Sequence, residues 1–234
     1  MKKILIASLL LAFTMTSYTK GQRGNGKVVA YKGKVYILQY QKGYKQIRVT
    51  KNIRIYPKDI ILTKRYSVVK VRLADGSYVT IKPNSRVQFS YVSQKSQRIS
   101  LGKGGLLSKV NKLRSKKGFA VNTPSSLAGV RGTKFVVEYD ENSEQNKIDV
   151  YEGQVNLNRD VVTKKKISRK IGNKRVSGNV RVINRRKSAL KKGNAITYGN
   201  RGRSKKRSSN AKLLKTYESM IESEAIEVSG WEYN

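Results

Sequence analysis

The sequence contains no cysteine and no histidine. These absences exclude thiol nucleophiles, the commonest general base and nearly all zinc sites. They also exclude disulfides and a lipid anchor attached to cysteine. Acidic residues are few as well, because 14 Asp and Glu face 51 Lys and Arg, and the formal net charge is +37. We therefore expect a protein that is not an enzyme, needs no metal or cofactor, and attracts polyanions.

A pair of carboxylates could still perform acid and base chemistry without histidine. The acidic residues are scattered along the chain, however. Their densest group is Glu138, Asp140, Glu141 and Glu144, which the pattern places at the solvated end of a hairpin. We expect no catalysis there.

Long hydrophobic runs are also missing. The longest runs from Ile4 to Met15, follows Lys2 and Lys3, and is succeeded by a polar stretch. This layout is typical of a secretory signal peptide, predicted here at residues 1–20. A run of about 12 residues is short for a membrane helix, which needs about 20, although an uncleaved anchor is the alternative. We expect an exported protein of the bacterial periplasm or cell envelope, with no transmembrane span after cleavage.

Short runs of alternating apolar and polar residues fill the chain between Lys27 and Leu157, including Val68–Leu73 and Tyr78–Lys82. Their richness in Val, Ile, Tyr and Thr predicts half-buried strands. Asp75 and Gly76 between two of them predict a hairpin, because Gly tolerates the positive φ of a tight turn. Further turns are predicted at 32–33, 83–85 and 152–153. Apolar residues at helical spacing predict one helix from Gly105 to Ser115.

Five ordered motifs stand in this region: Asp59–Thr63, Ser67–Ser85, Phe119–Tyr139, Val150–Asn156 and Leu190–Tyr198. The third contains Thr-Pro, a turn of small residues and Val-Arg-Gly-Thr-x-Phe. Together they resemble the FecR domain family. The resemblance implies an all-β domain at 27–160, a closing strand near 190–198, and protein binding as the activity. In the family an exported domain is linked through the membrane to a cytoplasmic anti-sigma segment. Only three residues precede the apolar run here, so we do not expect that segment.

The resemblance assigns family positions to a set of residues that we expect to be structural. Gly132 permits a bulge or close backbone approach, and the guanidinium of Arg131 can bridge carbonyls or a carboxylate. Alternatively, Arg131 and Thr133 line a site for an anionic ligand. Lys58 stands where the family usually has glycine. The assigned residues are Asp59, Asp75, Gly76, Thr123, Pro124, Val130, Arg131, Gly132, Thr133, Phe135 and Gly153.

Residues 161–209 are strongly basic and contain no acid. We predict an enlarged loop and linker here, disordered in part, because like charges resist compaction. The possible polyanion-binding residues are Lys164, Lys165, Lys166, Arg185, Arg186, Lys187, Arg203, Lys205, Lys206 and Arg207. Nucleic acid is the usual partner of such clusters, but the predicted leader disfavours it. Lipid head groups, anionic envelope polymers and acidic proteins remain as partners. Tyrosines beside lysines, as at Tyr40 and Tyr44, can form cation–π contacts or simply pack in strands.

Apolar residues at helical spacing predict an amphipathic C-terminal helix at 210–228, which docks on its own domain or on a partner. The expected architecture is all-β, an antiparallel β-sandwich or short β-roll, with a basic extension and one C-terminal α-helix. The expected function is a non-enzymatic interaction module that binds an envelope protein or an anionic envelope polymer. The alternatives are a structural or accessory subunit of an envelope assembly, and a nucleic-acid-binding protein.

Overall fold

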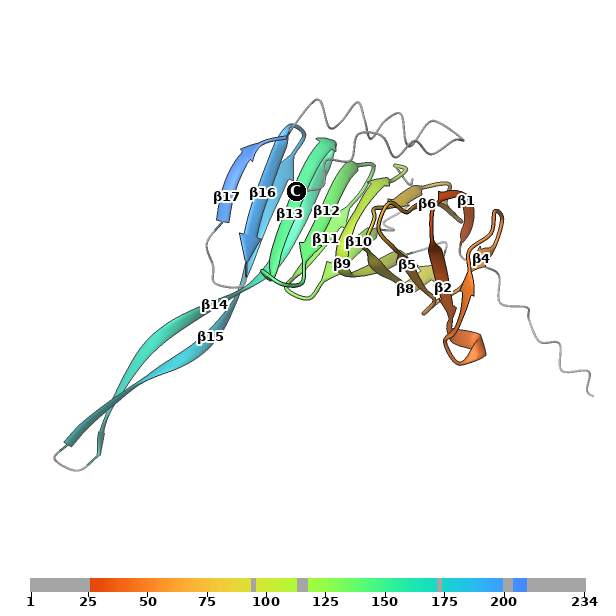
Figure 1. Ribbon diagram of the computed structural model, residues 1–234. Coiled ribbons are helices and arrows are strands. Elements are labelled where there is room, and N and C mark those ends of the chain that lie inside the picture. The colour runs from red at the N-terminus through yellow and green to blue at the C-terminus, as the bar shows by residue number, and fades with distance from the viewer. Residues whose placement is uncertain (1–25, 94–95, 113–117, 172–173, 200–203, 210–234) are drawn as a thin grey trace, which may run out of the picture.

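The computed structural model describes residues 26–93, 96–112, 118–171, 174–199 and 204–209 (Figure 1). Within these residues the chain is all-β, as predicted, with one short 3-10 turn, η1 (Tyr40–Lys42). The predicted leader at 1–20, the predicted helix at 210–228 and Arg203 lie outside the described residues.

Two sheets share one strand. Sheet I contains, in spatial order, β4 (Arg54–Ile55), β1 (Gly26–Lys32), β6 (Val68–Leu73), β7 (Tyr78–Ile81), β9 (Ser96–Lys109), β12 (Lys134–Asp140), β13 (Gln145–Glu152), β16 (Asn194–Gly199) and β17 (Ser204–Ser208). Sheet II contains β3 (Lys45–Arg48), β2 (Val35–Gln39), β5 (Ile60–Thr63), β8 (Arg86–Ser93), β9, β10 (Phe119–Thr123), β11 (Ser126–Val130), β14 (Gln154–Ile171) and β15 (Lys174–Lys191).

Strand β9 joins the sheets because its two halves have different neighbours. Its first half pairs with β8 and with β10, and its second half pairs with β7 and β12. Gly104 lies between the halves with a φ of 83°, and a Cβ there would stand 2.6 Å from the Cα of Ser85. The predicted helix at Gly105–Ser115 is therefore wrong where the chain is described, since Gly105–Lys109 continue as strand. Pairing with β7 and β12 satisfies their backbone groups as a helix would, so helical spacing of leucines does not decide the outcome.

One hydrophobic core lies between the two sheets and draws side chains from both. Val71 and Phe135 of sheet I and Ile37, Phe89 and Phe119 of sheet II are buried together. These residues alternate along their strands with outward-facing ones, which is why the sequence shows a period of two. The rings of Phe119 and Phe135 meet edge to face with centroids 6.1 Å apart.

The long hairpin of β14 and β15 extends well beyond the sheets (Figure 1). The two strands pair continuously from Gln154–Lys191 to Ile171–Lys174. The predicted loop was therefore wrong for this segment, and β14 crosses the predicted boundary between residues 160 and 161 without a break. Backbone pairing holds the segment extended despite its like charges, because alternate residues of each strand exchange hydrogen bonds with the opposite strand along its whole length.

Candidate functional site

The Val-Arg-Gly-Thr motif lies at the turn from β11 to β12, beside the turn from β13 to β14. Gly132 and Gly153 have φ values of 63° and 77°, which favour glycine. A Cβ on Gly153 would lie 2.6 Å from the carbonyl oxygen of Gly132, so the two turns pack backbone against backbone. Thr133 is buried, and its Oγ1 donates to the carbonyl of Gln154 at 3.1 Å. These contacts tie the two turns together.

A cleft of about 800 Å³ opens beside these turns. Among the described residues that line it the one acid is Glu152, which has a carboxylate oxygen 3.5 Å from the Nζ of Lys134. The cleft therefore carries a net positive charge and suits an anion rather than a cation. Its cationic lining residues are Lys109, Lys112, Arg131, Lys134, Lys191 and Lys192.

The other family positions make contacts within the fold. Asp59 is buried, and its carboxylate accepts the backbone N–H groups of Tyr40 and Tyr56 at 2.8 and 2.9 Å. Burial raises the pKa of Asp59, and these two hydrogen bonds oppose the rise. Lys58 has a φ of 71°, so the lysine adopts the left-handed conformation for which glycine is favoured.

The predicted hairpin at Asp75 and Gly76 joins β6 to β7. The carboxylate of Asp75 accepts the backbone N–H and the hydroxyl of Ser77, both at 2.9 Å. Gly76 has a φ of 81°, as the turn requires. These contacts are local and close the turn.

The Thr-Pro turn joins β10 to β11. The hydroxyls of Thr123 and Ser126 lie 2.8 Å apart, and the hydroxyl of Tyr198 donates to Ser126 at 2.7 Å. Pro124 is exposed at the tip. Because Tyr198 belongs to sheet I, this turn links the two sheets. The motif residues Val130 and Phe135, by contrast, are buried in the core.

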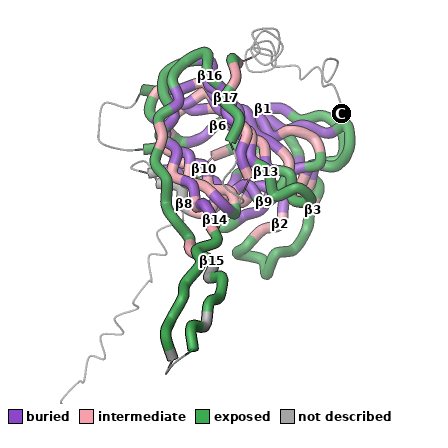
Figure 2. The backbone as a smooth tube through the Cα atoms, turned by 90° about the vertical axis from the view of Figure 1, so that its left-hand side faces the viewer, coloured by how far each residue is buried: buried purple, intermediate pink, exposed green. Residues whose placement is uncertain are grey.

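The second candidate region is the part of the long hairpin that pairs with no other strand, residues 162–171 and 174–183, here called the arm. The backbone of the arm lies outside the body, and its described residues are mostly exposed (Figure 2). At about 3.4 Å per residue it reaches roughly 30 Å from the sheet. Within the described part of the arm there is no acidic residue.

Ladder register divides the cations of the arm between two faces, because side chains alternate along each strand. Lys164 pairs with Arg181, and Lys170 pairs with Arg175. These four residues and Lys166 share one side of the ribbon, here called the basic face. Lys165, Arg169 and Lys174 occupy the opposite face. The predicted cluster of three lysines is thus divided between the faces.

The cluster at the base of the arm is also divided. Arg185 lies 3.2 Å from the carboxylate of Asp160, so its charge is partly offset. Arg186 and Lys187 are exposed and point to opposite sides of β15. Asp160 and Arg185 lie on the side that continues into the basic face.

The third predicted cluster lies on β17, where Lys205 and Lys206 are exposed. Arg207 instead contacts both carboxylate oxygens of Asp149, at 3.1 and 3.2 Å. Burial raises the pKa of Asp149, although Arg207 and Lys147 oppose the rise. The interpretation of Arg207 as a polyanion ligand does not fit this geometry, because its guanidinium holds β17 to β13.

Four acidic residues near the end of β12 were expected at a solvated hairpin end, and this expectation is wrong for one of them. Asp140, Glu141 and Glu144 are exposed, but Glu138 lies within the sheet between Lys82 and Lys147. Burial tends to raise the pKa of Glu138, but the two ammonium groups outweigh it and hold the pKa below its usual range. No cluster of three or more acids that could hold a metal ion occurs among the described residues.

No helix in the described part of the chain has the length and apolarity needed to cross a membrane.

Comparison with known proteins gave one family. Residues 59–156 match the family model described as FecR protein. Two crystal structures of a candidate anti-sigma factor from Parabacteroides distasonis ATCC 8503, at 1.65 and 2.50 Å resolution, match with 16% identity and a TM-score of 0.48. The match covers 68% of this chain and 64% of that chain, so it spans less than two thirds of that protein. No curated protein matches the sequence. The chain therefore contains a FecR domain at residues 59–156.

Proposed function

We propose that the protein is a non-enzymatic interaction module, exported to the bacterial cell envelope, that binds an anionic polymer or lipid head groups through the arm. The observation that carries this proposal is the arm itself, a paired ribbon of cations held outside the body with no acid among its described residues. The FecR domain supplies the rigid base. We assign its family residues to holding that base together.

The arrangement of charge on the arm supports a bound anion. Lys164 lies directly opposite Arg181, and Lys170 lies directly opposite Arg175. Like charges at directly opposed positions destabilise a ladder, by an amount within the roughly 0.2–1 kcal/mol range of such pairs. An anionic partner would remove this repulsion. Ile183, which is 68% exposed and lies on the same face, can contact the apolar parts of such a partner.

The energy available is large enough for stable attachment. Near an anionic membrane surface each Lys or Arg contributes about 1 kcal/mol before screening. Because the ribbon is already paired, binding orders little additional backbone. A two-stranded ribbon also fits the major groove of DNA, so nucleic acid is the competing partner. The leader pattern at residues 1–20 favours the envelope.

The test is sedimentation with vesicles of phosphatidylglycerol and phosphatidylcholine, compared with vesicles of phosphatidylcholine alone. Thr163 pairs with Val182, so residues 164–181 can be replaced by Asn-Gly, which forms a two-residue hairpin. We expect the wild type to bind only the anionic vesicles, with affinity falling steeply between 50 and 200 mM salt, roughly as for other polyanion binders. The shortened protein should lose this binding.

A control protein retains the arm but carries Lys32→Gln, Lys42→Gln and Lys51→Gln, three exposed positions on the body. It should bind nearly as well as the wild type. The control removes three cations and the shortened protein removes eight, so losses in proportion to these numbers would show that total charge acts rather than the arm. Tighter binding to duplex DNA than to vesicles at 150 mM salt, together with protein confined to the cytoplasm, would favour the nucleic-acid alternative.

A further inference from the structure

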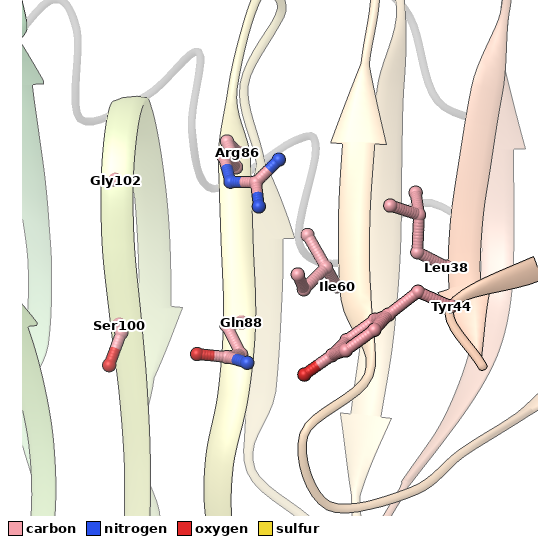
Figure 3. Close-up of a pocket in the computed structure, with 7 residues that line it drawn as sticks. All are labelled: Leu38, Tyr44, Ile60, Arg86, Gln88, Ser100 and Gly102. Carbon is pink, nitrogen blue, oxygen red and sulfur yellow. The ribbon is translucent and has the colours of Figure 1, made fainter. Parts of the chain in front are cut away.

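A pocket of about 430 Å³ lies on the outer face of sheet II, across β2, β5, β8 and β9 (Figure 3). Strands β2, β5 and β8 lie in the half of the molecule away from the arm (Figure 1). Core residues such as Ile37 and Ile61 alternate along these strands with the lining residues, so the pocket opens away from the core. The lining residues are Leu38, Tyr44, Ile60, Arg86, Gln88, Ser100 and Gly102.

The aromatic wall of the pocket is held by a family residue. Asp59 accepts the backbone N–H of Tyr40 at 2.8 Å and so fixes the start of η1. The ring of Tyr40 meets that of Tyr44 edge to face at 5.4 Å, and the Nζ of Lys58 lies 4.3 Å from the Tyr40 ring centre. Tyr44 is nevertheless 41% exposed. The ring is therefore held in place at the surface and is not buried in the core.

The polar side of the pocket offers one cation, one amide and one hydroxyl. Arg86 has neither a hydrogen bond nor an ion pair from its guanidinium within the described part of the chain. Gln88 donates its amide to the carbonyl of Lys58 at 3.3 Å, which leaves its own carbonyl oxygen as an acceptor. The hydroxyl oxygens of Ser100 and Ser90 lie 2.8 Å apart and form a hydrogen bond with each other. Gly102 carries no Cβ, and the nearest atom to one would be Cδ of Arg86 at 3.5 Å.

We propose that this pocket binds an acidic sugar residue, a pyranose ring bearing a carboxylate, as a unit of a linear glycan. The carboxylate matches the fork of Arg86, which can donate two parallel hydrogen bonds to it. The C–H face of the ring packs on Tyr44, because the negative face of an aromatic ring attracts the positive hydrogens. The ring hydroxyls meet Gln88 and Ser100. The apolar floor of Leu38 and Ile60 covers the remaining ring carbons.

The composition of the surrounding face favours a glycan over a protein. Ser100 pairs with Asn122, and the same row continues through Leu127 to Asn158. This row presents mainly hydroxyls and amides, whereas the centre of a protein interface is rich in apolar and aromatic groups. Strands are about 4.8 Å apart, comparable to the length of one sugar unit. A glycan chain can therefore continue from the pocket across the sheet.

The proposal does not depend on the arm, and its test separates the two. The probe is the hyaluronan tetrasaccharide, in which glucuronate alternates with N-acetylglucosamine. Chitotetraose, which has the same number of rings but no carboxylate, is the neutral control. In isothermal titration at 50 mM salt we expect the wild type to bind the acidic probe about tenfold more tightly than the neutral one.

Arg86→Gln should abolish this preference, and Tyr44→Ala should weaken binding of both probes. Arg98→Gln removes the same charge from an exposed position on the same sheet face and should bind like the wild type. All three variants should keep the circular dichroism spectrum and the vesicle binding of the wild type. The proposal is wrong if the acidic probe does not bind at millimolar concentration, if both probes bind equally, or if Arg98→Gln loses as much as Arg86→Gln.

Discussion

One guanidinium nitrogen of Arg207 on β17, Nη2, donates to both carboxylate oxygens of Asp149 on β13, across β16, which lies between their strands. The carboxylate of Asp149 is 3% exposed, whereas the side chain of Arg207 is 34% exposed. The pair therefore fastens the edge strand of sheet I to the interior of the sheet. Although Arg207 belongs to a basic cluster in the sequence, it stabilises the fold, because the carboxylate of Asp149 that balances its charge is buried beside it.

Removing Arg207 should destabilise the fold without affecting vesicle binding. In Arg207→Gln the buried Asp149 loses its strongest partner, and we expect a loss of about 1–3 kcal/mol at pH 7. The pKa of Asp149 should rise further, so the loss should shrink at lower pH as the carboxyl becomes neutral. Urea unfolding at pH 7 and pH 4 measures both effects. Lys205→Gln on the same strand should be neutral, and an equal loss there would contradict the assignment.

Adding one methyl group at Gly153 should be costly. The φ of 77° is unfavourable for alanine, and its Cβ would lie 2.6 Å from the carbonyl oxygen of Gly132. We expect Gly153→Ala to lose about 2 kcal/mol or more of unfolding free energy. Gly178→Ala is the matched control, because a Cβ there meets no atom within 4 Å. Its stability should be unchanged or slightly higher, and thermal unfolding of the two variants compares them directly.

Glu138 should stabilise the fold at neutral pH and lose this effect in acid. Its pKa is lower in the folded state than its ordinary value of 4.5 because of Lys82 and Lys147. A lowered pKa contributes stability above the unfolded value, which disappears as pH falls through the folded value. Glu138→Gln should therefore be less stable than the wild type by about 1–3 kcal/mol at pH 7. The gap should be smaller at pH 3, below the ordinary value, than at pH 7. A gap of the same size at both pH values would show that packing, and not charge, is responsible.

The two faces of the arm should differ in vesicle binding. Lys164→Gln, Lys166→Gln and Arg181→Gln together neutralise three cations of the basic face. The matched variant, Lys165→Gln, Arg169→Gln and Lys174→Gln, removes the same charge from the opposite face. We expect the first to reduce the slope of log affinity against log salt by about 2–3 and the second by less. Identical slopes would mean that the ribbon acts as an unoriented charge. The measurement is vesicle sedimentation at five salt concentrations.

The strands and turns could be predicted wherever local chemistry and burial agree. Val69 and Val71 face the core and alternate with outward-facing residues. The alternation of apolar residues at every second position in the sequence therefore predicts which side chains are buried. Asp75 and Gly76 form the expected hairpin because its contacts are local and need no distant partner. The all-β class was likewise predictable, because the family motifs and the alternation of residues gave the same answer.

The arm and the sheet-face pocket could not be predicted for different physical reasons. A run of like charges without a buried face predicts a disordered segment. Backbone pairing between β14 and β15, from Lys164–Arg181 onward, nevertheless holds the arm extended. The β-branched residues Val182 and Ile183 were a signal that could have indicated a strand. The pocket joins Leu38 of β2 to Arg86 of β8, which lie far apart in the sequence. Residues on one sheet face have no common sequence signal until the strand order is known.

Because β9 is hydrogen-bonded in both sheets, neither sheet can unfold while the other stays intact. Hydrogen exchange should therefore report a single slow class of amides along Ile99–Leu107, released only in global unfolding. Folding must likewise bring β12 and β8 to the same strand from opposite directions along the chain. The pairings between strands distant in the sequence, such as β1 with β6 and β9 with β12, predict slow refolding.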